Sequence, residues 1–173
     1  MLSDSELQNN LAYHQQVYAS CNYDPRITQL SSKSSILEVC GWVEQAMDLL
    51  VRDTANRCNL SPKYISLVDK KYIEKTFGFE YRRHFEKMLI AVVGYRVLEN
   101  AENHSGNDLI KMEAVLSDLS KLRNHYAHTY FDINNPTPQG YSSIPTPTIM
   151  INHAAIAAKG LLALETSLIN LNC

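Results

Sequence analysis

The sequence predicts an all-helical protein, and three observations lead to that prediction. Apolar residues recur at spacings of three and four over several long segments, which is the period of an amphipathic helix. The 173 residues include only six glycines and six prolines, and four of the prolines crowd into 136–147. The composition, 45% hydrophobic and 20% charged, is ordinary for a globular protein. The length suits one well-packed domain, which we expect to span 1–173.

The N-terminal half is expected to hold two longer helices and one or two short ones. The first begins at SDSE, where Ser3 and Glu6 have the spacing of a capping box, and is broken before Pro25. A Ser-rich connector, SSKSS, then leads into a second helix over about 35–58. Its apolar stripe consists of Ile36, Val39, Cys40, Val43, Met47 and Leu50. Ser61 as N-cap and Pro62 at the first helical position then begin one or two short helices over 61–76.

The C-terminal half is expected to hold three long helices. One covers about 79–103 and is interrupted by NHSGND, and the next starts near 108. A Pro-rich loop separates it from an Ala- and Leu-rich helix over about 152–171. The predicted architecture is therefore a bundle of four principal helices with an additional N-terminal helix and a Pro-rich loop before the last helix.

The segment KLRNHYAHTYF, from Lys121 to Phe131, carries more chemistry than a plain helix end needs. On one continuous helix over 109–130, with Met112 at zero, Arg123 falls at about 20°, within the apolar stripe. Asn124 and His128 fall at about 120° and 160°, together on a flanking face. The pattern therefore places a guanidinium where a leucine would be expected.

A buried, unpaired charge costs several kcal/mol, so a partner for Arg123 is required. Glu44 is the candidate, because it lies at the edge of the apolar stripe of the second helix. Alternatively, this part of the stripe faces a cleft or a second subunit, and Arg123 points at a phosphate of a ligand. A purely architectural ion pair is also consistent with the pattern.

At these residues the sequence resembles the HEPN superfamily of all-helical nucleotide-binding domains. Its ribonuclease members carry Arg followed by four to six residues and then His, which RNHYAH matches. Tyr130 extends the match to Arg-x4-His-x-Tyr, the form found in toxins of HEPN–nucleotidyltransferase pairs, although Leu122 stands where those toxins commonly have glycine. The polar loop that follows is more similar to stand-alone and defence-linked branches. The resemblance covers the order of elements over most of the chain and a handful of specific residues.

The resemblance implies metal-independent RNA cleavage at a composite site in a homodimer, acting as a toxin or an antiviral defence effector. His128 would perform acid–base catalysis, Arg123 would stabilise the phosphate, and Asn124 would orient the phosphate or the imidazole. Glu44, Tyr130 and His125 would support them. No metal or cofactor is implied, and the expected partners are RNA and an antitoxin or other regulatory protein. The dimer also follows from geometry, because Arg123 and His128 diverge by about 140° on an ideal helix.

The formal net charge of −2 excludes a general polycation, so RNA would need a local basic patch. The most basic stretch offers one, with Lys70, Lys71, Lys75, Arg82, Arg83 and Lys87. Acidic residues interleave with these, as on an ordinary solvated face. The phosphate-loop, HExxH and GxSxG motifs do not occur.

Cysteine usage and hydropathy predict a reduced, cytoplasmic protein. The four cysteines form no CxxC pair, the N-terminus reads as no signal peptide, and no apolar run approaches a membrane span. Trp42 lies with Leu49 on a secondary apolar strip of the second helix, which suggests a second packing surface for a dimer or a partner.

Two other functions stay open. One is a non-catalytic HEPN module that binds a nucleotide or protein and uses the Arg123–Glu44 pair structurally. The other is a regulatory helical protein that cleaves no nucleic acid. Catalysis predicts an accessible His128 at a dimer cleft, whereas the first alternative predicts a buried, hydrogen-bonded His128.

Overall fold

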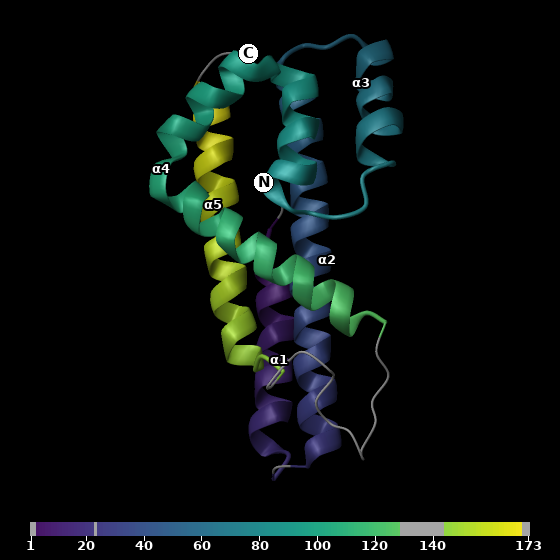
Figure 1. Ribbon diagram of the computed structural model, residues 1–173, viewed down its shortest axis with the longest axis vertical. Helices are drawn as coiled ribbons and strands as arrows, with labels where there is room; N and C mark the ends of the chain where they lie inside the picture. Colours follow the sequence, from purple (N-terminus) through teal and green to yellow (C-terminus); the bar gives the residue numbers. More distant parts are fainter. Residues whose placement is uncertain (1–2, 23, 129–143, 171–173) are drawn as a thin grey trace.

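A computed structural model describes residues 3–22, 24–128 and 144–170, and every regular element within these ranges is helical. This confirms the predicted all-helical class. The helices are α1 (Ser5–Ser20), α2 (Pro25–Arg57), α3 (Pro62–Val68), α4 (Glu86–Tyr126) and α5 (Pro147–Asn170), with short π-helical turns η1 (Asp69–Ile73) and η2 (Tyr81–Phe85) between α3 and α4. In Figure 1, α1 and α2 form a long hairpin, α5 runs beside them, and α4 bends around both. Most of the predicted Pro-rich loop lies outside the described residues.

Helix α2 begins ten residues earlier than predicted, so the Ser-rich connector was wrong. Asp24 caps the helix, because its Oδ1 accepts hydrogen bonds from the Arg26 and Ile27 amides at 2.8 and 3.4 Å, and Pro25 follows at the first position. The serines of the supposed connector lie inside the helix. Ser31 donates to the His14 carbonyl at 2.7 Å, which joins α2 to α1. Small side chains whose hydroxyls bond to backbone carbonyls let the two helices pack closely.

Helix α1 covers the surface that Trp42 was expected to offer to a partner. The indole is buried, with 7% of its surface exposed, and its Nε1 donates to the Ser3 carbonyl at 3.2 Å. The expected capping box is also wrong, because α1 begins at Ser5 with Asp4 at the N-cap position, and the Asp4 side chain makes no capping hydrogen bond. Trp42 therefore packs within the chain rather than at an interface.

Helix α4 consists of three straight segments, 86–93, 95–105 and 107–126, separated by two glycines. Gly94 (φ 77°, ψ 165°) and Gly106 (φ 53°, ψ −131°) adopt backbone conformations that residues with a side chain rarely enter. The chain changes direction at both, as the upper and left parts of Figure 1 show. The predicted interruption at NHSGND corresponds to the bend at Gly106, whereas the bend at Gly94 was not predicted.

The third segment of α4 packs tightly on α5, which begins five residues earlier than predicted, at Pro147. A Cβ added to Gly160 would overlap Met112 and approach the Asp108 carbonyl to 2.9 Å, so only glycine permits this approach. Lys159 pairs with Asp108 at 3.0 Å beside it. These contacts hold the start of the third segment against α5.

Helix α5 is long and apolar enough to cross a membrane by length and composition, a criterion that the sequence was expected not to meet. Its apolar residues include core side chains that pack with α2 and α4. Of its most apolar stretch, 39% is buried, so the bundle covers this helix only in part.

Candidate functional site

Arg123 and Glu44 form the ion pair expected from the sequence. Arg123 Nη2 lies 3.2 Å from Glu44 Oε1, and the two side chains are 35% and 33% exposed. Arg123 comes from the third segment of α4 and Glu44 from the middle of α2, where the two helices cross (Figure 1). The apolar stripe alone suggested a fully buried guanidinium. Arg123 instead lies at an edge that solvent reaches.

Cys40 forms the floor beneath this pair, one helical turn before Glu44. Its side chain is buried, and its Sγ donates to the Leu119 carbonyl at 3.7 Å. Burial raises the pKa of the thiol to about 12, and the nearby Arg123 charge opposes that rise only in part. Because the thiol stays protonated at neutral pH, Cys40 contributes to the packing of the core and does not act as a nucleophile.

Helix α4 ends at Tyr126, four residues before the predicted end, so His128 lies in the turn beyond the helix. The divergence of about 140° expected for Arg123 and His128 on a continuous helix therefore does not apply. Asn124 and His128 are both exposed. Because His128 is exposed, it is not the buried histidine that the non-catalytic alternative predicts.

Two of the three residues between Asn124 and His128 pack inward, and the third, Ala127, is exposed. Tyr126 is buried, and the half-buried ring of His125 meets it edge-to-face, with ring centroids 4.8 Å apart. This places His125 beside the core, behind the exposed side chains of Asn124 and His128. Tyr130, the sixth candidate of this group, lies outside the described residues.

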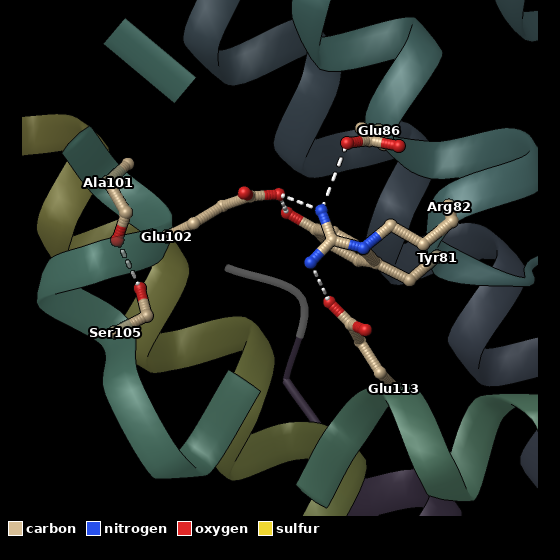
Figure 2. Close-up of polar contacts among 7 residues, drawn as sticks. All are labelled: Tyr81, Arg82, Glu86, Ala101, Glu102, Ser105 and Glu113. Atoms are coloured by element: carbon tan, nitrogen blue, oxygen red, sulfur yellow. Dashed lines mark hydrogen bonds and ion pairs between the residues drawn. The ribbon is translucent and has the colours of Figure 1, made fainter. Parts of the chain in front are cut away.

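Arg82, a member of the predicted basic patch, is occupied by carboxylates. Its Nη1 lies 3.0 Å from Glu86 Oε1 and 2.8 Å from Glu102 Oε1, and its Nη2 lies 2.8 Å from Glu113 Oε1. The Tyr81 hydroxyl also donates to Glu102 at 2.9 Å. Figure 2 shows the three carboxylates converging on one guanidinium. The surroundings of Arg82 are thus acidic, which weighs against its place in the predicted RNA-binding patch.

The remaining patch residues are divided between separate elements. Lys70 and Lys71 are exposed on η1, and the Lys71 ammonium lies 5.5 Å from the Tyr72 ring centroid. Arg83, on η2, lies 3.6 Å from Glu80, and Lys87 is exposed at the start of α4. Lys75 is exposed beyond η1. The predicted patch is thus spread over η1, the segment after it, η2 and the start of α4.

Titration in the Arg82 cluster follows from burial and from the excess of negative charge. Burial raises the pKa of Glu113, and the Arg82 charge opposes this shift while Glu102 adds to it. Burial also raises the pKa of Tyr81 far above its usual range, and the neighbouring Glu102 adds to that rise. Tyr81 therefore stays a neutral donor to the Glu102 carboxylate.

Sequence reasoning missed this cluster. The spacing of Arg82 and Glu86 is a recognisable i,i+4 pair. Glu102 and Glu113 come to Arg82 only because α4 bends at Gly94 and Gly106, and no local pattern indicated both bends. In the described part of the chain, no group of three His, Cys, Asp or Glu side chains is arranged to hold a metal ion.

Comparison with known proteins adds no family to these observations, since no family model, curated protein or solved structure matches the chain.

Proposed function

We propose that this protein is a metal-independent RNA endonuclease of the HEPN type, with its site around Arg123, Asn124 and His128. The observation that carries the proposal is the Arg123–Glu44 contact at 3.2 Å, at an edge of the molecule where a phosphate can reach the guanidinium. Glu44 supplies one carboxylate to a group with five N–H donors, so donors of Arg123 stay available to a phosphate. The exposed Asn124 and His128 follow on the same end of α4.

The chemistry uses the RNA's own nucleophile. A base removes the proton of a 2′-hydroxyl, the 2′-oxygen bonds to the adjacent phosphorus, and the bond from phosphorus to the 5′-oxygen breaks. An acid then protonates the leaving 5′-oxygen, which yields a 2′,3′-cyclic phosphate and a 5′-hydroxyl. Arg123 stabilises the charge of the phosphorane, and Glu44 orients the guanidinium. Histidine suits both proton transfers, because its ordinary pKa is about 6.5.

A homodimer supplies the second proton-transfer group. The candidate site of one chain offers one exposed histidine, His128, whereas the reaction needs a base and an acid at the same phosphate. Two copies related by a two-fold axis would bring two His128 side chains and two Arg123 side chains to one cleft. A monomer that cleaves RNA with full activity would contradict this arrangement.

The test compares the wild type with His128→Ala on total RNA and on tRNA, in EDTA, with thermal melts and light-scattering masses for each protein. His104→Ala is the matched control, because His104 is also exposed on α4 but lies on the second segment. We expect the His128 variant to lose at least about 10²-fold in rate, because positioned proton transfer contributes 10²–10⁴-fold. The control should keep both its activity and its melting temperature.

Products ending in 2′,3′-cyclic phosphate, formed by a dimer and lost only in the His128 variant, would establish the mechanism. A folded wild-type dimer that cuts none of these RNAs would overturn the proposal in favour of the non-catalytic binding module. In that case the Arg123–Glu44 pair would be structural, and Glu44→Gln would lower stability without any other measurable effect.

A further inference from the structure

We propose that Arg82 is a positioning residue that holds the third segment of α4 at the angle at which Arg123 meets Glu44. The inference rests on the proposed function for its effect on catalysis, but the geometric link stands on contacts that involve no RNA. It assigns a role to a cluster on η2 and α4 that is separate from the candidate site.

The three carboxylates around Arg82 come one from each segment of α4. Glu86 belongs to 86–93, Glu102 to 95–105 and Glu113 to 107–126. Figure 2 shows them approaching the guanidinium from three directions. The planar guanidinium of one arginine thus contacts all three segments. Because the helix is interrupted at both bends, its backbone hydrogen bonds do not fix the angles between these segments.

Glu113 is the contact that matters for the site. It lies seven residues after the bend at Gly106 and ten residues before Arg123 on the same segment. At 1.5 Å per residue, Arg123 lies about 25 Å from the bend, so a rotation of about 10° there moves it by about 4 Å. Such a displacement is larger than the 3.2 Å that separates Arg123 from Glu44. The site therefore depends on how firmly this angle is held.

Two kinds of contact hold the third segment near the bend. Gly160 and Lys159 of α5 fix its start through Met112 and Asp108, which limits its translation. The Arg82–Glu113 pair ties the opposite side of the fold, η2, to the same region at 2.8 Å. The raised pKa of Glu113 means that its surroundings, taken together, do not favour the ionised carboxylate, even with Arg82 beside it. The pair accordingly sets geometry more than it adds to the stability of the fold.

The experiment compares Glu113→Ala with Glu86→Ala as its matched control. Both variants remove one carboxylate from the same guanidinium, but Glu86 lies on the first segment and only Glu113 belongs to the segment that carries Arg123. The first readout is amide hydrogen exchange over 107–126 in the full chain without RNA. The second is the NMR signal of the Arg123 Nε–H group, assigned by its absence from Arg123→Lys.

We expect Glu113→Ala to speed exchange over 107–126 by about tenfold and to shift the Arg123 signal, with both measures nearly unchanged in Glu86→Ala. In the RNA-cleavage assay, the same variant should lower kcat by about tenfold and leave KM unchanged, because the phosphate-stabilising group is displaced. Arg82→Lys should also shift the Arg123 NMR signal away from its wild-type position, since an ammonium cannot span three carboxylates.

Equal changes in the two alanine variants, in proportion to their losses in melting temperature, would overturn the inference and leave Arg82 a general stabilising residue. An unchanged Arg123 signal in Glu113→Ala would overturn it as well. If the exchange and the signal change as expected but the wild type cleaves no RNA, the geometric link holds and the proposed function fails. The two ideas are thus separable.

Discussion

Two arginines that contact carboxylates have opposite surroundings. Arg82, on η2, contacts three carboxylates of α4 at 2.8–3.0 Å, whereas Arg123, near the end of α4, contacts one from the described part of the chain, at 3.2 Å. The first guanidinium is more than neutralised by its three carboxylates. The second meets a single carboxylate in the described part of the chain, which is the feature on which the proposed phosphate contact depends. A basic residue in a sequence therefore indicates an anion site only when the fold leaves its charge unmatched.

The sharpest way to break this comparison is to remove each arginine in turn and measure catalysis. Arg123→Met should lower kcat by about 10²–10³-fold, because a preorganised donor to a developing negative charge contributes about 3–4 kcal/mol. Its melting temperature should change little, since a partly exposed pair contributes about 0–1 kcal/mol. Steady-state kinetics on RNA and a thermal melt check both statements. Equal losses of activity in Arg123→Met and Arg82→Met would remove the distinction.

The bend that brings Glu113 to Arg82 can be tested at Gly106. Gly106→Ala should lower the free energy of unfolding by about 1–3 kcal/mol, because an L-residue is strained at a positive φ. An added Cβ would meet nothing within 4 Å, so backbone strain is the sole expected cause. Gly41→Ala, inside α2 and equally free of neighbours, is the control and should gain about 0.5–1 kcal/mol. Urea unfolding measures both, and a stable Gly106 variant would contradict the observed bend.

The acidic excess around Arg82 gives a smaller effect on stability. Arg82→Gln should lower the free energy of unfolding by about 1–2 kcal/mol at pH 7, because the three carboxylates then repel one another. The loss stays small because the Arg82 side chain is 54% exposed and solvent screens its charge. The loss should shrink in 1 M NaCl, which is measurable by melts at two salt concentrations. A loss that does not depend on salt would point to packing rather than charge.

The smallest effect is the pH dependence of that loss. The folded-state pKa of Glu113 is raised above its unfolded value, and removing Arg82 raises it further. A carboxyl with a raised pKa favours folding below its unfolded pKa of about 4.5 and loses that contribution as pH rises through the folded pKa. The stability difference between wild type and Arg82→Gln should therefore narrow on acidification from pH 7 toward 4.5. A difference that widens would contradict the raised pKa.

Local patterns predicted the features that depend on neighbours in sequence. Helical spacing located the end of α2 and both ends of α5 to within five residues, and the stripe of α2 identified Glu44 as the candidate partner of Arg123. The errors arose where tertiary contacts override local preference. The serine stretch continues the α2 helix, and the Ser31 hydroxyl joins it to the His14 carbonyl of α1, while Trp42 donates to the Ser3 carbonyl just before α1. The end of α4 at Tyr126 was also missed.

The sequence by itself determined the helical class and the position of Arg123 on an apolar stripe, because helical periodicity is visible in residue order. It also named Glu44 as the candidate partner, because an unpaired buried charge is costly, and the contact between α4 and α2 bears that out. Only the tertiary structure decided that Arg82 gathers Glu86, Glu102 and Glu113, because two glycine bends bring together carboxylates up to 31 residues from it along the chain. It also decided that Arg123 lies at an accessible edge, since exposure depends on which helices cross and where the crossing ends.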